Sequence, residues 1–122
     1  MALPKDSETT LLLHNPRCSK SRQTHALLEE RGIPFEVQLY LEDPLSTHEL
    51  EDLGQRLGRP VIEWTRTKEA AFSEMGLSKD SPPIKIFGAM LAAPILMERP
   101  IVVRGPRAII GRPPEDVLAL FD

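Results

Sequence analysis

The stretch Thr10-Leu11-Leu12-Leu13-His14-Asn15-Pro16-Arg17-Cys18-Ser19-Lys20-Ser21-Arg22 decides the fold of this chain. Its first part, residues 10–14, is a short apolar run that predicts a buried strand, which the following proline ends. Behind it, apolar residues recur at helical spacing and predict an amphipathic helix that stops at Gly32. Cys18 is the only cysteine of the chain, and it lies where this strand passes into this helix.

Cys18 is predicted to be a reactive thiol. A cysteine that stands alone in a soluble domain is more often a small buried apolar residue, but here its neighbours include the cations Arg17, Lys20 and Arg22. A helix N-terminus adds unpaired backbone N–H groups and the positive end of the helix dipole, and both favour the thiolate over the thiol. Because the thiolate is the nucleophile, this setting is typical of a catalytic cysteine.

Three residues near Cys18 are candidates for stabilising its thiolate. The segment Cys18-Ser19-Lys20-Ser21 has the form of a Cys-x-x-Cys motif whose second cysteine is serine. The Ser21 hydroxyl can donate a hydrogen bond to a thiolate but cannot resolve a mixed disulfide, so a catalytic cycle needs an external thiol. His14 is either a strand-end histidine with a satisfied hydrogen bond or an imidazole that organises the loop and lowers the thiol pKa. Arg17 is the third candidate.

The rest of the chain continues the alternation of strands and helices. The predicted elements are, in order, a strand at 35–41, a helix from a capping box at Ser46 to Gly58, a helical region at about 60–97, strands at 101–103 and 108–110, and a final helix after Pro113-Pro114. This order, βαβα, helices, ββα, predicts one α/β domain over 10–122 behind a loose lead-in at 1–9, with parallel strands in its first half. Tyr40 and Trp64 are interpreted as packing residues.

Composition describes one ordinary globular domain and excludes several classes of protein. The chain has 122 residues, 41% of them hydrophobic and 27% charged. Its net charge of −3 argues against a general nucleic-acid binder. There is no apolar stretch of about 20 residues for a membrane span, no apolar signal core at the N-terminus, no second cysteine for a disulfide and no Cys/His spacing for a metal. We therefore expect a cytoplasmic protein without membrane contact or bound metal.

Three arginines are candidates for binding an anion. Arg66, Arg99 and Arg112 are isolated in the sequence, and each on its own reads most simply as a solvated surface side chain. Two of them stand directly before proline at the borders of predicted strands. Pro100 is a candidate cis-proline, because an Arg-Pro bond before a strand is a plausible place for a cis peptide. Arginines at a pocket rim bind tetrahedral oxyanions through forked hydrogen bonds.

Taken together, these segments resemble the glutaredoxin-coupled arsenate reductase family. They occur in the family's order and cover residues 10–121. The matching pieces are His14-Asn15-Pro16-Arg17-Cys18-Ser19-Lys20-Ser21-Arg22, Leu39-Tyr40-Leu41-Glu42, Arg66, Arg99-Pro100-Ile101-Val102-Val103 and Ile110-Gly111-Arg112-Pro113-Pro114. The resemblance implies a thioredoxin-like fold with an inserted helical region and a mixed central sheet.

The resemblance also implies a reaction. Cys18 would attack arsenate as a thiolate, while Arg66, Arg99 and Arg112 hold the oxyanion and the charge that develops on it. Glutathione would then act as co-substrate and glutaredoxin as the reducing partner, with arsenite as the product and no bound cofactor. Pro100 would correspond to the cis-proline of the fold. We expect a monomer.

Two other functions stay open at this point. Spx-like regulators share the fold and bind RNA polymerase, but they typically use a Cys-x-x-Cys redox switch, and Ser21 removes its second cysteine. The other alternative is a thiol oxidoreductase, or a glutathionylated adaptor, that does not turn over arsenate.

Overall fold

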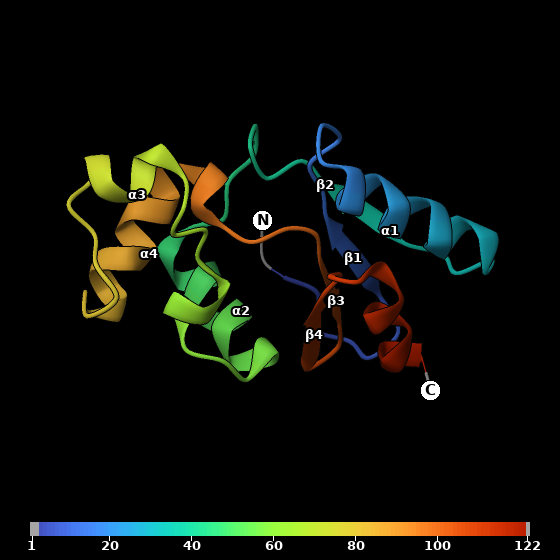
Figure 1. The fold of residues 1–122 in the computed structure, drawn as a ribbon. Coiled ribbons are helices and arrows are strands. Elements are labelled where there is room, and N and C mark those ends of the chain that lie inside the picture. Colours follow the sequence, from blue (N-terminus) through green and yellow to red (C-terminus); the bar gives the residue numbers. More distant parts are fainter. Residues whose placement is uncertain (1–2, 122) are drawn as a thin grey trace.

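A four-stranded mixed sheet organises the computed structural model, which describes residues 3–121 (Figure 1). Its strands, in the spatial order β2-β1-β3-β4, are β1 (Thr10–Leu13), β2 (Glu36–Gln38), β3 (Ile101–Arg104) and β4 (Arg107–Ile110). Strands β1 and β2 run parallel, as predicted, whereas β1 with β3 and β3 with β4 are antiparallel pairs. The mixed α/β class is therefore confirmed.

Helices lie on both sides of this sheet (Figure 1). They are α1 (Ser19–Glu30), α2 (Thr47–Leu57), η1 (Val61–Trp64), α3 (Ala70–Glu74), α4 (Pro83–Ala92), η2 (Pro94–Leu96) and η3 (Pro114–Phe121). Helices α1 and η3 lie together on one side, and α2 to α4 form the other side with the short helices between α2 and β3 (Figure 1). Among residues 3–121, no helix combines the length and the apolar character that crossing a membrane requires.

The two central strands are buried on both faces. Successive side chains of a strand point to opposite faces, so Leu12 and its partner Val102 contribute to the cluster with α1 and η3. The neighbouring pairs, Leu11 with Val103 and Leu13 with Ile101, contribute to the larger cluster with α2 and α4. A continuous apolar run such as residues 10–13 is typical of a strand covered on both sides.

The register of the sheet brings the functional segments to one edge. Leu13 pairs with both Gln38 and Ile101, and Ile101 pairs with Ile110. The chain that follows β1, β2 and β4 therefore leaves the sheet at the same edge at which β3 begins. The residues that this edge carries, in chain order, are Cys18, Tyr40, Arg99 and Arg112.

Helix α2 begins at the predicted capping box. The Ser46 Oγ accepts the Glu49 N–H at 3.1 Å, and the Ser46 N–H donates to Glu49 Oε1 at 3.0 Å. The helix ends at Gly58, whose φ of 68° is a left-handed conformation that glycine adopts without a Cβ clash. Local sequence signals thus set both ends of this helix.

The strand predicted at 35–41 is wrong in length and in the face it buries. Strand β2 ends at Gln38, and a turn follows in which Leu39 O accepts the N–H groups of Glu42 and Asp43. The apolar set of the alternation faces outward, with Leu39 37% and Leu41 38% exposed, whereas Gln38 and Tyr40 are buried. The pairing with β1 decides which set faces inward, and the local pattern does not contain this information.

The two ends of the chain also differ from expectation. In the predicted lead-in at 1–9, residues 1 and 2 lie outside the described residues, but Leu3 is buried in the core and Arg56 donates a hydrogen bond to Pro4 O. Residues 3 and 4 thus contact the domain, whereas residues 5–8 are exposed. The predicted final helix is present as η3, a 3₁₀ helix rather than an α-helix.

Candidate active site

Cys18 is the N-cap residue of α1. Its backbone is extended, with φ of −95° and ψ of 126°, and its N–H donates to Asn15 O at 3.0 Å. The Asn15 Oδ1 in turn accepts the N–H of Arg17 at 3.0 Å, and Arg22 Nη1 donates to Pro16 O at 2.9 Å. These bonds close a tight loop that presents a half-buried free thiol to the first turn of the helix.

The surroundings lower the pKa of Cys18. Burial is the largest single effect and raises the pKa, but hydrogen bonds from the Ser21 N–H, the Arg99 side chain and the Lys20 N–H, together with the charge of Arg99, outweigh it. The lowered pKa therefore comes from the helix N-terminus and from one arginine 81 residues further along the chain. Arg17, expected to stabilise the thiolate, is exposed, and the guanidinium that acts on the thiol is that of Arg99.

Ser21 and His14 hold the loop together beneath the thiol. The Ser21 hydroxyl is fully buried, accepts the Asn15 N–H at 3.0 Å and lies 2.6 Å from His14 Nδ1. In that bond the hydroxyl donates when the imidazole carries its proton on Nε2. The sequence predicted that the Ser21 hydroxyl donates to the thiolate. In the structure this hydroxyl bonds within the loop instead, and it is the Ser21 backbone N–H that donates to the sulfur.

His14 is buried, and its pKa is lowered by that burial and then by electrostatic interaction with His25 and Arg22. A neutral imidazole is therefore favoured. The His14 ring has a satisfied hydrogen bond, to Ser21, and thereby helps to organise the loop, but a neutral ring adds no positive charge beside Cys18. The backbone N–H of His14 donates to Gln38 O at 3.0 Å. This hydrogen bond fixes the start of the loop to the end of β2.

A backbone bridge places Arg66 next to the segment that precedes β3. Thr65 pairs with Met97 in an isolated antiparallel bridge. On either side of it, the Arg66 N–H donates to Leu96 O at 2.7 Å and the Glu98 N–H donates to Trp64 O at 3.0 Å. This bridge is how the helical region delivers its arginine to the edge of the sheet that carries Cys18.

The three candidate arginines meet around two carboxylates. Arg66 donates from Nε to Glu69 Oε2 and from Nη1 to Glu98 Oε1, each at 3.1 Å. Arg112 donates from Nη1 to Arg99 O at 3.0 Å, and its Nε lies 3.9 Å from Glu98 Oε1. Side chains from three separate segments of the sequence thus form one cluster, as their grouping as anion-binding candidates requires.

Arg99 holds the central place in this cluster and is the least satisfied member. Its side chain is 14% exposed. Within residues 3–121, its buried Nε and Nη1 have no hydrogen-bond partner; the nearest carboxylate oxygen, Glu69 Oε2, is 3.9 Å from Nη1. Buried polar groups in proteins are almost always paired. An arginine with two free N–H groups beside an acidified thiol is therefore set up to bind an oxyanion.

Close packing at Gly111 positions Arg112. The Gly111 N–H donates to Pro100 O at 2.9 Å, and a Cβ at this residue would lie 2.8 Å from Thr24 Oγ1 and 2.9 Å from Pro100 Cγ. Only glycine fits between α1 and this proline without displacing one of them. The Arg99–Pro100 peptide bond is cis, as is Arg112–Pro113.

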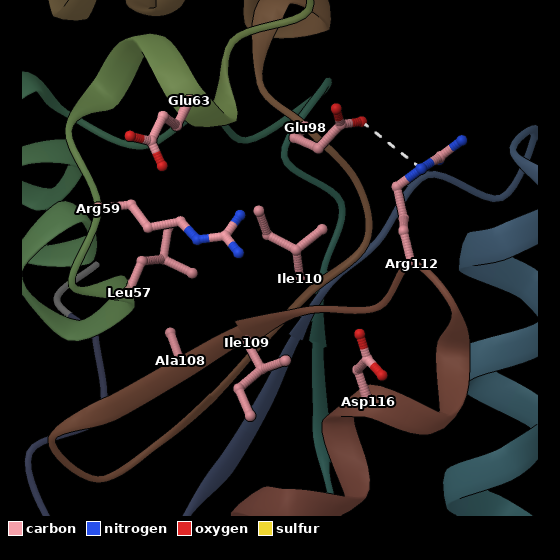
Figure 2. A pocket seen from close by; sticks show the side chains of 9 residues that line it. All are labelled: Leu57, Arg59, Glu63, Glu98, Ala108, Ile109, Ile110, Arg112 and Asp116. Atoms are coloured by element: carbon pink, nitrogen blue, oxygen red, sulfur yellow. Dashed lines mark ion pairs between the residues drawn. The ribbon is translucent and has the colours of Figure 1, made fainter.

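A cleft of about 410 Å³ lies beside the arginine cluster (Figure 2). Its floor is apolar and comes from β4, and the Arg59 guanidinium extends into it from the side of α2 and η1 (Figure 2). The charged residues that line it are Arg59, Glu63, Glu98, Arg112 and Asp116. Two of them, Glu98 and Arg112, also belong to the arginine cluster, so the cleft and the cluster share a wall.

Sequence reasoning missed Glu69 and Glu98, which hold the arginines in place, and it assigned Tyr40 to packing. Nothing in the local sequence distinguishes these two glutamates from the other acidic residues. Their role follows only from the bridge between Thr65 and Met97, which brings the two segments together. No group of three or more His, Cys, Asp or Glu side chains within the described part of the chain could hold a metal ion.

Comparison with known proteins gives a consistent result. The sequence model of the ArsC family matches residues 13–120. An arsenate reductase of Haemophilus influenzae is 41% identical over 93% of this chain and 99% of its own length. The protein YfgD of Escherichia coli is 48% identical over 89% of this chain and 93% of its own length. Among solved structures, an arsenate reductase from Vibrio cholerae is 44% identical with a TM-score of 0.88, over 94% of this chain and 99% of that one.

Proposed function

The chain belongs to the ArsC family, and on that premise we propose that it reduces arsenate to arsenite with Cys18 as the nucleophile. The fold is the thioredoxin-like fold of this family. The observation that carries the proposal is the pairing of an acidified thiol with Arg99, whose Nε and Nη1 have no partner within residues 3–121. One group supplies the attacking electron pair, and the other binds the charge of the anion under attack.

In the first step the Cys18 sulfur forms a bond to arsenic, and one arsenate oxygen leaves as water after it has taken up protons. The arginine cluster neutralises the charge of the oxyanion while the carboxylates of Glu69 and Glu98 keep the arginines in place. Arsenic is still pentavalent after this step. Its reduction needs two electrons, and Cys18, the only cysteine, can share in supplying them only with a second thiol from outside.

Glutathione is the second thiol in this proposal. Its sulfur and that of Cys18 give up the two electrons that take arsenic from the pentavalent to the trivalent state, and the two thiols end as a mixed disulfide. Arsenite leaves, and glutaredoxin with a further glutathione reduces the disulfide and restores Cys18. A reducing cytoplasm would supply both partners. The position of a resolving cysteine is occupied by Ser21, which also argues against a regulator switched by a Cys-x-x-Cys disulfide.

The cleft beside the arginine cluster is the proposed place for glutathione. The tripeptide carries two carboxylates and one ammonium group, and the cleft offers arginines for the former and carboxylates for the latter: Arg59, Arg112, Glu63 and Asp116. Its shared wall at Arg112 would bring a bound thiol toward the arsenic. This assignment rests on charge and on place, since the cleft adjoins the cluster that holds the oxyanion.

The proposal is tested by NADPH consumption in a coupled assay with arsenate, glutathione, glutaredoxin and glutathione reductase. We expect turnover that depends on each component and falls to background in Cys18→Ser. Arg66→Ala, Arg99→Ala and Arg112→Ala should each weaken transition-state binding by roughly 1–3 kcal/mol, the value of a hydrogen bond to a charged group. Arg31→Ala, at the far end of α1, is the matched control and should be unaffected. Activity that survives in Cys18→Ser would refute the mechanism.

A further inference from the structure

Tyr40 carries a buried hydroxyl with no hydrogen-bond partner. The residue is 1% exposed, and its Oη is without a partner among residues 3–121. Leaving a buried hydroxyl unpaired costs about 1–3 kcal/mol, so native structures rarely keep one that serves no purpose. A purely packing role would be filled equally well by phenylalanine, which lacks this cost.

The backbone places Tyr40 at the edge of the sheet that carries the site. Tyr40 follows the last residue of β2 by two positions, in the turn that Leu39 O closes. Because β1 and β2 are parallel, this turn and the Cys18 loop leave the sheet at the same edge, and the His14 N–H ties them together through Gln38 O. In this turn Tyr40 is buried, whereas the apolar residues on either side of it are exposed.

The charges that act on the hydroxyl belong to the site. Burial raises the pKa of Tyr40 to about 12, and smaller effects come from the charges of Arg99, Cys18, Arg66 and Glu98. The hydroxyl therefore keeps its proton at any working pH and acts as a hydrogen-bond donor rather than as a base. These four groups all belong to the site that is proposed to bind and attack the oxyanion.

The cavity that borders the Tyr40 ring offers no polar side chain. A cavity of about 10 Å³ borders Tyr40, at the lower limit of the space that one water needs. A buried water also needs two or more polar partners. The remaining residues that line this cavity have apolar side chains: Pro44, Leu45, Leu50, Met90, Pro94 and Met97.

We propose that the Tyr40 O–H donates a hydrogen bond to the bound tetrahedral oxyanion, beside the free N–H groups of Arg99. The inference rests on the proposed function, since arsenate is the anion concerned. A neutral donor adds affinity and fixes the orientation of one oxygen without adding charge. The Tyr40 hydroxyl also requires that the anion direct an oxygen lone pair toward it, which restricts the geometry of the anion rather than its charge.

The test is arsenate binding to Cys18→Ser, which cannot form the arsenic–sulfur bond, compared with the double variant Cys18→Ser/Tyr40→Phe by calorimetry. We expect about a tenfold loss of affinity in the double variant, which is about 1.4 kcal/mol. Thermal unfolding of the ligand-free proteins separates binding from folding. Because the hydroxyl has no partner in the free protein, Tyr40→Phe should leave Tm unchanged or raise it.

A second readout uses the fact that Tyr40 is the only tyrosine of the chain. Arsenate should produce a tyrosine difference spectrum in Cys18→Ser that is absent in the double variant, a change that a packing role does not produce. Equal arsenate affinity in the two proteins would overturn the inference and leave the proposed function standing. Absence of arsenate binding in both, together with no turnover in the coupled assay, would overturn both.

Discussion

At the scale of the single residue, the acidity of Cys18 has a local source and a distant one. The local source is the first turn of α1, whose N–H groups at Lys20 and Ser21 point at the sulfur. The distant source is the guanidinium of Arg99. Exposed cations near the cysteine in sequence are screened by water, whereas a largely buried arginine beside the sulfur is not.

This division predicts the effect of two charge removals on the thiol pKa. In Arg99→Gln the midpoint of the alkylation rate against pH should move upward, because the thiolate loses a donor and a positive charge. In Arg17→Gln, the matched control, the midpoint should stay close to that of the unchanged protein, which we expect below the free-cysteine value of about 8.5. Equal upward shifts in both variants would contradict the assignment to Arg99.

The same shift has a consequence for stability. Folding lowers the pKa of Cys18, so the unfolded chain binds more protons at this group between the folded and the unfolded pKa. The free energy of unfolding should therefore rise with pH across that window. The contribution of Cys18 is complete above about pH 8.5 and is lost as the pH falls through the folded pKa. This contribution should disappear in Cys18→Ser.

At the scale of the element, the site depends on how closely the segment after β4 approaches α1. Gly111 lies in contact with Thr24 of α1 and with Pro100, and its N–H bond to Pro100 O joins the two arginine-bearing segments. Arg112 follows directly and donates to Arg99 O. The position of one guanidinium is thus set by a residue that has no side chain.

Gly111→Ala should consequently destabilise the fold and weaken the site together. The added methyl meets atoms at 2.8 and 2.9 Å, and overpacking of this kind costs about 1–3 kcal/mol. The measurements are the denaturation midpoint and the KM for arsenate, which should rise as Arg112 is displaced.

Gly88→Ala in α4 is the matched control. A Cβ at that position meets nothing within 4 Å, and alanine is favoured over glycine within a helix by up to about 1 kcal/mol. This variant should be as stable as the unchanged protein or more stable, with its KM for arsenate unaltered. A loss of stability in both variants would mean that backbone flexibility, and not contact with Thr24 and Pro100, is what Gly111 provides.

At the scale of the whole molecule, the cleft and the arginine cluster share one wall and are otherwise lined by different residues. Arg59 comes from the segment between α2 and η1, lines the cleft, and is not a member of the cluster around Glu69 and Glu98. The two proposed binding sites, for glutathione and for the oxyanion, can therefore be perturbed one at a time.

Arg59→Ala should raise the KM for glutathione several-fold and leave the KM for arsenate unchanged. The reason is the loss of a charged partner for a glutathione carboxylate, with the arginine cluster left intact. Steady-state kinetics with each substrate varied in turn make the measurement, and Arg31→Ala serves again as the control. A rise in the KM for arsenate alone would place Arg59 in the oxyanion site and remove the cleft from the proposal.

The parts of this molecule that the sequence predicted are those that depend on neighbours in the chain. The capping box at Ser46, the position of Cys18 before α1 and the order of strands and helices all follow from local spacing. The bond of the Ser21 hydroxyl to His14, by contrast, forms only when the loop closes. The burial of Gln38 and the exposure of Val37 depend on the pairing of β2 with β1, and an alternating pattern reads the same in either orientation.

The wide spacing of Cys18 and Arg99 along the chain has a consequence for protein synthesis. While the ribosome is still making the second half of the chain, Cys18 lacks the guanidinium of Arg99, which lies 81 residues further along the sequence. The thiol then has a higher pKa than in the folded protein and is less reactive toward oxidants and electrophiles. Completion of the chain and its folding add the contribution of Arg99, so Cys18 reaches its full reactivity only when the whole site is present.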